Sequence, residues 1–309
     1  MKKYIKIARP DHWVKNAFIL PGIVIAFLLA EWSITIPQFI VRFICGFFAT
    51  CFIASANYVI NEWLDAEFDK YHPTKKNRPV VSENMKFSLV MVEYVICIIL
   101  GVVLSLFVNT PFLIVELILL LMGVLYNVKP FRTKDIVYMD VLSESINNAL
   151  RLLLGWFIVT DILLPPSSII IGYWFAGAFL MATKRFAEYR MIGDPEMAGL
   201  YRKSFKYYTE VKLLVSSFFY AMCATFFIGV FMIKYRMQYI FGMPFIFGLF
   251  CFYLAIAFKP DSAVQKPEKL YREKSLLLYL LLLVIVLLLL TFINIPMPDY
   301  WLKPTLFNV

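Results

Sequence analysis

Long apolar stretches alternate with short polar connections along the chain. A helix needs about 20 mainly apolar residues to cross the hydrocarbon core of a bilayer. On this basis we expect nine membrane-spanning helices, which lie at residues 14–30, 37–60, 86–108, 111–127, 138–160, 167–184, 211–233, 238–258 and 275–294. The pattern therefore predicts an all-α, polytopic membrane protein in which residues 1–309 form a single integral membrane domain.

The composition agrees with this pattern. Of the 309 residues, 61% are hydrophobic and 17% are charged, whereas a soluble domain has about 25% charged residues. The net charge of +9 is compatible with nucleic-acid binding, but the basic residues lie in the connections, as cytoplasmic loop charges do. We therefore expect no nucleic-acid partner. The cysteines all lie within apolar stretches and form neither a disulfide framework nor a metal motif.

The distribution of lysine and arginine predicts an orientation in the membrane. Basic residues are frequent before the first apolar stretch and after the second, fourth, sixth and eighth stretches. Because basic loops stay in the cytoplasm, we expect a cytoplasmic N-terminus and, with nine spans, an external C-terminus in the inner membrane. The basic N-terminus mimics a signal peptide, but its apolar run shows no small-residue cleavage site, so we expect a retained first helix.

Polar residues recur every fourth position at the end of the second apolar stretch. Asn57, Asn61, Asp65 and Asp69 share one helix face, because steps of four residues drift only about 40° around a helix. Glu62 lies on the same face. Carboxylate and carboxamide oxygens suit a hard cation such as Mg²⁺. We expect Asn61, Asp65 and Asp69 to bind Mg²⁺ and Asn57 to contact substrate.

Cations follow this acidic face directly. They include Lys75 and Arg78, which we expect to bind substrate. Carboxylates that hold Mg²⁺, beside cations that hold phosphate, are what a diphosphate substrate requires. The alternative is a solvated helix end with mixed charges. Polar groups that continue a membrane helix are costly and usually functional, which favours the substrate site. His72 is a single loop histidine, and we assign it no role.

A second polar cluster begins after the fourth apolar stretch and continues into the fifth. Asp140 and Glu144 are four residues apart, as are Asn147 and Arg151, so a polar stripe follows one side of the expected helix. Such stripes face the bundle interior or a wet cavity. An interhelical hydrogen-bond seam is the alternative for the asparagines, whereas we expect Asp140 to act in catalysis. The substrate-binding residues expected from this cluster are Tyr126, Lys129 and Lys134.

A third cluster ends the sixth apolar stretch with Lys184, Arg185 and Glu188. We expect the two cations to bind phosphate at the edge of a cavity, with Glu188 orienting them. The alternative is an ion pair between Lys184 and Glu188, which have i,i+4 spacing. The long connection that follows is expected to cap the cavity.

The N-terminal segment ends in the residues ARPDHWVKNAFILPG. Its aromatic and basic side chains suit the headgroup layer of a membrane. Lys15 can serve as such an anchor or point into the mouth of the cavity and bind substrate, and the sequence leaves both interpretations open.

Three motifs resemble the UbiA superfamily of intramembrane prenyltransferases. The pattern from Asn61 to Asp69 resembles its NDxxDxxxD signature, with Glu62 in place of the second aspartate. Within the superfamily, the decaprenyl-phosphate phosphoribosyltransferases are most similar. Their motifs RPxxWxKN, DxxxDxxHPxKxxRP and GKRxxE correspond to RPDHWVKN, DAEFDKYHPTKKNRPV and TKRFAE, where Thr183 replaces the glycine.

The resemblance implies a bundle of nine helices with a cytoplasm-facing cavity, in which aspartates bind a diphosphate through Mg²⁺. It implies transfer of 5-phosphoribose from phosphoribosyl diphosphate to a polyprenyl phosphate, with Asp65, Asp69 and Asp140 as catalytic residues. It is also compatible with a homo-oligomer. The alternative enzyme moves a prenyl group from its diphosphate to another acceptor. A transporter is a third hypothesis, but the polar groups crowd the cytoplasmic ends of the helices instead of forming a transmembrane path.

Overall fold

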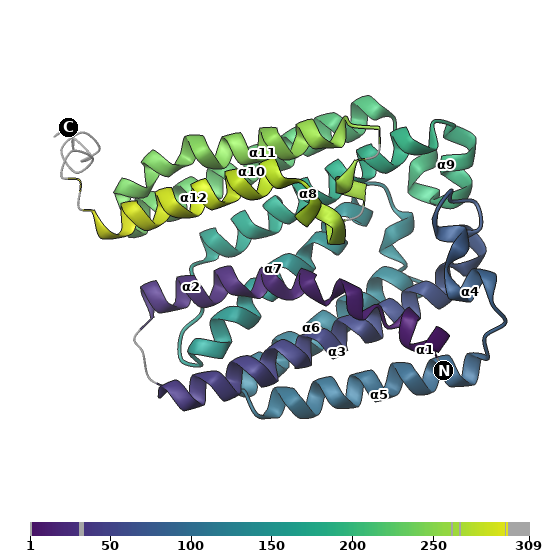
Figure 1. Ribbon diagram of the computed structural model, residues 1–309, viewed down its shortest axis with the longest axis horizontal. Helices are drawn as coiled ribbons and strands as arrows, with labels where there is room; N and C mark the ends of the chain where they lie inside the picture. Colours follow the sequence, from purple (N-terminus) through teal and green to yellow (C-terminus); the bar gives the residue numbers. More distant parts are fainter. Residues whose placement is uncertain (1, 31–33, 261, 266, 294, 296–309) are drawn as a thin grey trace.

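The computed structural model describes residues 2–30, 34–260, 262–265, 267–293 and 295. All regular elements in these ranges are helical, and the long helices run along a common axis (Figure 1). The prediction of an all-α membrane bundle is confirmed. The C-terminal residues 296–309, whose external position the sequence predicts, lie outside the described ranges.

The long helices are α2 (Leu20–Leu29), α3 (Ile36–Asp69), α5 (Phe87–Leu106), α6 (Thr110–Asn127), α7 (Met139–Val159), α8 (Ser167–Ile192), α10 (Glu210–Tyr235), α11 (Met243–Ala257) and α12 (Lys274–Phe292). Shorter α-helices are α1 (Lys2–Ile7), α4 (Pro79–Ser82) and α9 (Pro195–Tyr201). The 3₁₀ segments are η1 (Pro10–Ile19), η2 (Lys75–Asn77), η3 (Thr133–Asp135), η4 (Lys203–Lys206), η5 (Met237–Gly242), η6 (Ala263–Gln265) and η7 (Pro267–Arg272).

Helical structure lies over each of the nine predicted spans, but the count of nine is not confirmed. Among the described residues, seven helical segments are long and apolar enough to cross a membrane, and α7 and α8 are not among them. These two helices carry the polar side chains of the second and third clusters. Because those side chains face inward, the helices are less apolar than those that face lipid.

The middle of the bundle is α7, which packs against α2, α3, α6 and α8. The contact between α2 and α7 is especially close. A Cβ atom at Gly22 would lie 2.0 Å from the Leu152 carbonyl oxygen, and one at Gly155 would lie 2.0 Å from that of Ile19. Small residues let membrane helices approach in this way. This contact fixes η1, which continues into α2, against the polar part of α7.

Local signals set the ends of the helices that carry the polar clusters. Thr35 and Gln38 form a capping box at the start of α3, and Gly193, with φ of +69°, ends α8. The 34 residues of α3 extend about 51 Å at 1.5 Å per residue. Because the hydrocarbon core is about 30 Å thick, the C-terminal turns of α3 emerge from the membrane.

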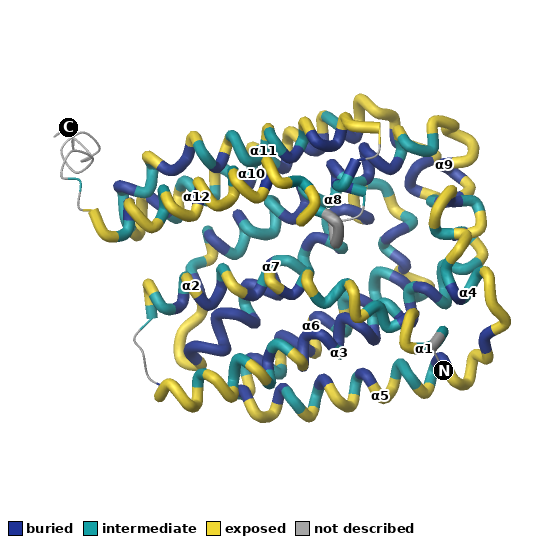
Figure 2. Tube along the Cα trace, in the orientation of Figure 1, coloured by how far each residue is buried: buried dark blue, intermediate teal, exposed yellow. Residues whose placement is uncertain are grey.

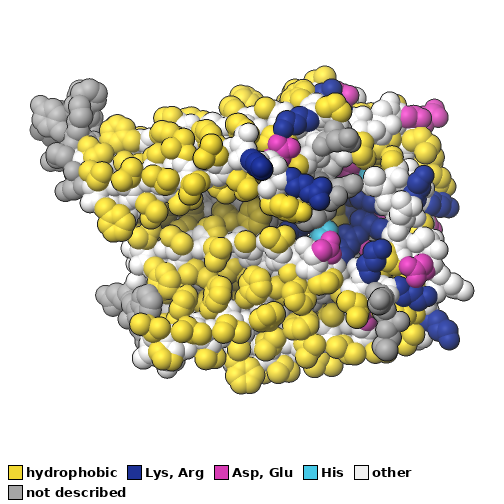
Figure 3. Space-filling model, viewed as in Figure 1, with side chains coloured by type: hydrophobic (Ala, Val, Ile, Leu, Met, Phe, Trp, Pro, Cys, Tyr) yellow, Lys and Arg dark blue, Asp and Glu magenta, His cyan; other side chains and the backbone are white. Residues whose placement is uncertain are grey.

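The surface divides into apolar flanks and one charged end. The helices turn their buried sides toward one another and expose their outer sides (Figure 2). Hydrophobic side chains cover the visible flanks, and charged side chains gather at the end of the bundle where α1, α4 and α9 lie (Figure 3). The C-terminal turns of α3 reach this same end (Figure 1). The bundle therefore presents its polar clusters together, at one end.

Candidate active site

A cavity of about 700 Å³ lies among η1, α3, α6, α7, α8 and the connections at the charged end. Most of the site residues predicted from the sequence line it: Lys15, Asn57, Asn61, Asp65, Asp69, Lys75, Arg78, Tyr126, Lys184, Arg185 and Glu188. Three do not, namely Lys129, Lys134 and Asp140. The three polar clusters, which are far apart in the sequence, are thus brought together around one cavity.

The acidic face of α3 points into this cavity, and its carboxylates are bonded to cations from other elements. Asp65 Oδ1 accepts hydrogen bonds from Arg132 Nη2 at 2.9 Å and from Lys134 Nζ at 2.5 Å. Asp69 is paired with Arg78. Lys134 therefore contributes to the site from behind, through Asp65, without lining the cavity itself.

Two arginines that pair with carboxylates of α3 have unusual backbone geometry. Arg9 and Arg132 have φ of +51° and +31°, a left-handed conformation that costs a non-glycine residue about 1–3 kcal/mol. The Arg9 guanidinium lies 2.9 Å from Glu62 Oε2, and Arg132 reaches Asp65. Such strain concentrates at functional sites, and here it aims both guanidinium groups at the α3 face.

His72 shapes the loop that presents Lys75. Its Nδ1 accepts hydrogen bonds from the backbone N–H groups of Thr74 and Lys75, both at 3.2 Å. The ring proton is therefore assigned to Nε2, which lies 3.3 Å from Glu188 Oε1. The side chain is 2% exposed. The HP dipeptide in the loop motif was the only sequence signal for this residue, to which the sequence analysis assigned no role.

Lys75 crosses the cavity from the α3–α4 loop to α8. Its Nζ donates to Glu188 Oε1 at 2.6 Å and also contacts the Tyr201 hydroxyl, which donates to the same carboxylate oxygen at 3.1 Å. Burial lowers the pKa of Lys75 to about 8, and the Glu188 carboxylate opposes this shift. Burial also lowers the pKa of Lys134 to about 8, opposed by Asp65. Both ammonium groups therefore titrate close to physiological pH.

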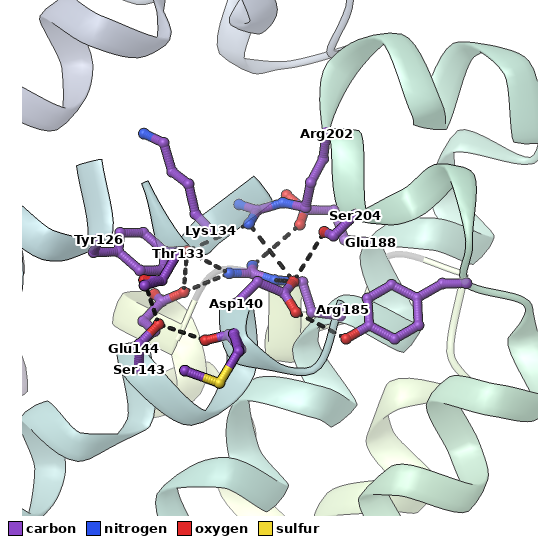
Figure 4. A network of polar contacts seen from close by, with 12 residues as sticks. Tyr126, Thr133, Lys134, Asp140, Ser143, Glu144, Arg185, Glu188, Arg202 and Ser204 are labelled. Atoms are coloured by element: carbon purple, nitrogen blue, oxygen red, sulfur yellow. Dashed lines mark hydrogen bonds and ion pairs between the residues drawn. The ribbon is translucent and has the colours of Figure 1, made fainter. Parts of the chain in front are cut away.

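Arg185 is engaged by carboxylates on all sides (Figure 4). It is 1% exposed and pairs with Glu144, with Asp140 at 3.5 Å and with Glu188 at 3.5 Å. The predicted phosphate contact would have to compete with all three. The alternative ion pair between Lys184 and Glu188 is absent from the described part of the structure, in which Glu188 pairs with Lys75 and Arg185 instead.

Asp140 holds the segment after α9 and does not line the cavity, and its catalytic role stays a prediction. Its side chain is fully buried and accepts hydrogen bonds from Ser204 Oγ at 3.1 Å and Tyr208 OH at 2.8 Å. Both partners follow α9 in the chain. The carboxylate therefore fastens the covering segment to the first turn of α7, close to Arg185 (Figure 4).

Lys129 also lies outside the cavity, at a separate surface hollow. The chain turns back after α6, because Arg132 N donates to Val128 O at 2.9 Å and Arg132 Nη1 donates to Asn127 O at 3.0 Å. This turn exposes Lys129 and points Arg132 and Lys134 inward. The sequence shows three cations in this loop, but only the folded turn decides which of them face the carboxylates.

Several residues in or beside the cavity had no predicted site role. Glu144 lines the cavity and Arg132 pairs with Asp65. Both lie in the second polar cluster of the sequence, so their positions carried a signal. Tyr201 and Arg202 lie in the predicted capping connection, where no spacing pattern marks them. Arg202 Nη1 lies 3.3 Å from the Tyr126 hydroxyl, so this connection reaches across the cavity to α6.

The α3 face fits a metal ion that is shared with a substrate. Among the described residues, no group of three or more His, Cys, Asp or Glu residues is arranged to hold a metal. Mg²⁺, however, commonly uses one or two carboxylates and takes its other ligands from substrate phosphates and water. Asn61, Asp65 and Asp69 supply such oxygens to the cavity, and a bound diphosphate would complete the set.

Comparisons with known proteins place the chain among membrane transferases. The model of the UbiA prenyltransferase family matches residues 18–281. Decaprenyl-phosphate phosphoribosyltransferase of Corynebacterium glutamicum is 28% identical over 221 residues, which are 72% of this chain and 63% of that protein. The enzyme of that name from Mycolicibacterium smegmatis is 28% identical over 211 residues, 67% of this chain and 62% of that one. The chain thus matches less than two thirds of the length of these relatives.

Solved structures share the fold. A UbiA homolog from Archaeoglobus fulgidus, solved with GPP and Mg²⁺, superposes with a TM-score of 0.68. The match covers 91% of this chain and 99% of that one, at 18% sequence identity. At this identity the similarity supports the arrangement of the helices and not a shared substrate.

Proposed function

Because this chain belongs to the UbiA prenyltransferase family, we propose that it transfers 5-phosphoribose from phosphoribosyl diphosphate to a polyprenyl phosphate and releases diphosphate. The observation that carries the proposal is the concentration of cations at this site: Arg78, Arg132 and Lys134 pair with the α3 carboxylates, and Lys75 from the neighbouring loop reaches Glu188 on α8. A donor with a diphosphate and a separate phosphate needs many such groups. The matched phosphoribosyltransferases support the same choice.

The α3 face would hold Mg²⁺ together with the donor diphosphate, through Asn61, Asp65 and Asp69. When bound, Mg²⁺ would neutralise charge on the diphosphate and stabilise it as a leaving group. Lys75 and Arg78 already lie at the cavity wall on the neighbouring loop. They would exchange their present carboxylate partners for phosphate oxygens, which are acceptors of the same charge.

The proposed reaction needs positioning more than proton transfer. An oxygen of the lipid phosphate attacks the anomeric carbon of the ribose, and the bond from that carbon to the diphosphate oxygen breaks. The diphosphate leaves with the electron pair. The lipid phosphate is already an anion, so it needs no general base. Lys75 and Arg78 would stabilise the departing charge, and the cavity would hold acceptor and donor together.

The cavity is proposed to face the cytoplasm. The donor is a water-soluble phosphorylated sugar, and the basic residues of the chain gather at the end of the bundle where the cavity lies (Figure 3). Basic segments remain on the cytoplasmic side of the membrane. The apolar flanks would then span the inner membrane, and the lipid acceptor would reach the cavity from the bilayer.

A prenyl transfer reaction is the second candidate. The observation that favours it is the apolar lining of the membrane side of the cavity by residues such as Phe18, Leu180 and Met181. The Archaeoglobus fulgidus homolog of the same fold binds GPP and Mg²⁺. In that reaction the lipid would carry the diphosphate, and the same carboxylates would bind it.

The decisive test combines the purified protein with Mg²⁺, a polyprenyl phosphate and radiolabelled phosphoribosyl diphosphate. Label should move into the organic phase, and Asp65→Asn should reduce the rate by about 100-fold or more, as expected for loss of a charge-stabilising group. Lys134 keeps a hydrogen bond to Asn127 at 2.7 Å in that variant, so the fold should persist.

Asp135→Asn is the matched control for this test. Asp135 pairs with Arg132 at 3.2 Å, as Asp65 does at 2.9 Å, but it does not line the cavity. Its substitution should leave the rate within a few fold. Equal rates for Asp65→Asn and the wild type would refute the assigned metal site. If the protein transfers a prenyl group from a prenyl diphosphate and transfers no phosphoribose, prenyl transfer, the second candidate, is established.

A further inference from the structure

Arg151 and Lys184 line the cavity, and among the described residues neither forms an ion pair with a carboxylate. Arg9, Lys75, Arg78, Arg185 and Arg202 each have a carboxylate oxygen within 4.0 Å. In the described part of the chain, neither Arg151 nor Lys184 forms an ion pair at that distance, although both line the same cavity. A charged group within a membrane bundle is costly unless another charge offsets it. The two side chains therefore mark the place of an anionic ligand.

Arg151 is the deeper of the two. It is 9% exposed and follows Asp140 by eleven residues on α7, which places it about 16 Å further into the membrane. Its Nε donates to Asn16 Oδ1 at 2.9 Å and its Nη1 donates to Asn147 O at 3.2 Å. The buried carboxyl of Glu116 is bonded to Thr50. Arg151 is thus held by neutral acceptors and keeps its charge for a ligand.

The N-terminal segment brings a third cation to the same place. Asn16 ties Arg151 to η1, and the residue before it is Lys15, whose Nζ lies 5.9 Å from the centre of the Tyr58 ring. Tyr58, Arg151 and Lys184 line the same cavity as Lys15. Cations from η1, α7 and α8 are therefore available to one ligand in this cavity.

The surroundings of these cations are apolar on the membrane side. Leu180 and Met181 lie one turn before Lys184 on α8, and Phe18 lies three residues after Lys15 on η1. All three line the cavity. Near Lys75, by contrast, the lining residues include Thr74, Asn77 and His72. The cavity thus has a polar end suited to a sugar phosphate and a second cation group at the edge of an apolar surface.

We propose that Lys15, Arg151 and Lys184 bind the phosphate of the polyprenyl phosphate acceptor, and that Phe18, Leu180 and Met181 contact the first part of its hydrocarbon chain. The proposal rests on the proposed function for the identity of the acceptor. It assigns the two phosphate groups of the donor to the polar end instead, around Lys75 and Arg78. An acceptor without a phosphate, such as the corresponding alcohol, would leave Arg151 and Lys184 without an anionic partner and bind weakly.

Direct binding tests the subsite without any reaction. Farnesyl phosphate, farnesol and inorganic phosphate are each titrated against the wild-type protein in nanodiscs, with no donor and no metal. The wild type should bind farnesyl phosphate at least tenfold more tightly than it binds farnesol, which lacks the phosphate, or inorganic phosphate, which lacks the hydrocarbon chain. Lys184→Gln should weaken farnesyl phosphate binding by about 10- to 100-fold, the range for loss of a hydrogen bond to a charged group, and leave farnesol binding unchanged.

Kinetics then distinguish the acceptor phosphate from the 5-phosphate of the donor. In Lys184→Gln, the KM for the polyprenyl phosphate should rise about tenfold or more while the KM for phosphoribosyl diphosphate stays within twofold. A rise confined to the donor KM would overturn the proposal and assign the cations to the 5-phosphate. Unchanged values for both substrates would overturn it as well.

Control variants accompany both the binding and the kinetic measurements. Lys86→Gln makes the same substitution at an exposed lysine that does not line the cavity, and it should match the wild type. Lys15→Gln replaces Lys184→Gln if the latter does not fold. If the wild type transfers no phosphoribose but loses farnesyl phosphate binding on substitution of Lys184, the proposed function fails and the phosphate subsite stands. If farnesyl phosphate binds no better than farnesol, the subsite itself is refuted.

Discussion

Asp65 and Asp69 each form ion pairs with cations of neighbouring segments, and an incoming substrate must replace these pairs. Arg132 and Lys134 contact Asp65, and Arg78 contacts Asp69. An incoming diphosphate with Mg²⁺ offers the carboxylates a cation and offers the cations an anion. Binding therefore exchanges one set of ion pairs for another and leaves no isolated charge. The desolvation free energy of the buried site stays low for this reason.

The charge of Lys75 should make donor binding depend on pH. Because burial lowers its pKa from 10.5 to about 8, the ammonium group loses its proton as the pH rises from 7 to 9. The affinity for phosphoribosyl diphosphate with Mg²⁺ should fall about tenfold over this interval. Titration calorimetry at a series of pH values measures the change. Lys75→Arg should show a smaller fall, because a guanidinium group stays charged.

Stability should change in the opposite direction, which separates loss of binding from unfolding. The folded pKa of Lys75 lies below its unfolded value, so the unfolded state binds more protons between about pH 8 and 10.5. The contribution of this residue to the free energy of unfolding therefore increases with pH in that window. Identical binding profiles for the wild type and Lys75→Arg would exclude Lys75 as the titrating group.

Asp140→Asn should destabilise the protein by about 3 kcal/mol, because it removes a buried charge that faces Arg185 and two hydroxyl donors. The free energy of unfolding in mixed micelles measures this loss. Asp194→Asn is the control, because Asp194 caps α9 through its side-chain oxygen and asparagine caps equally well. Equal stability of the two variants would contradict the fastening role of Asp140.

Among the single helices, the length of α3 and the polar face of α7 determine where the site lies. The 34-residue α3 is longer than the membrane is thick, so its last turns carry Asp65 and Asp69 beyond the hydrocarbon. The inward face of α7 carries Glu144, Asn147 and Arg151 along the cavity wall. The cavity therefore extends from the membrane surface into the bundle, along two helices with different polar faces.

Gly155→Ala should destabilise the contact between α2 and α7 by about 1–3 kcal/mol, the usual cost of overpacking. The added Cβ would meet the backbone carbonyl of Ile19 at 2.0 Å, and a carbonyl in a helix has no room to move. Thermal unfolding measures the effect. Gly229→Ala is the control, because the nearest atom there lies at 3.8 Å. A melting temperature for Gly155→Ala equal to that of the control would show that the contact is loose.

At the scale of the whole molecule, two packed groups of helices meet at α7 and α8. One core surrounds α2, α3, α6 and α7, and the other surrounds α8, α10 and α11. The polar connections at the charged end join them, since Lys75 from the α3–α4 loop reaches Glu188 on α8. A ligand in the cavity would contact both groups at once and hold them together.

Donor and metal should therefore stabilise the fold together. At 100 times its dissociation constant, phosphoribosyl diphosphate with Mg²⁺ should add about 2.7 kcal/mol, which raises the melting temperature by about 5 °C. EDTA should abolish this increase, and added Mg²⁺ should restore it. An increase that survives exhaustive chelation would show that the donor binds without the metal.

The residues of the site were predictable to different degrees. The shared helix face of Asn61, Asp65 and Asp69 could be predicted, because helical spacing places the three residues on one side of the helix in any fold. The burial of Asp140 was not predictable, because its position on a polar stripe says nothing about how deeply the neighbouring segment covers it. Lys129 and Lys134 occupy one loop, and their opposite directions follow from a turn that hydrogen bonds of Arg132 create. His72 required knowledge of the loop geometry.

The class of the protein, the approximate positions of its helices and the acidic face of α3 follow from the amino-acid sequence. These properties are local, since hydrophobic length and helical periodicity act over one or a few turns. Tertiary packing sets which cations neutralise which carboxylates, and which cations of the described ranges form no ion pair. Lys75 and Glu188 are separated by more than a hundred residues, and their contact depends on the packing of whole helices. An ion pair depends on the distance between two side chains in the folded protein, and the local sequence pattern does not give that distance.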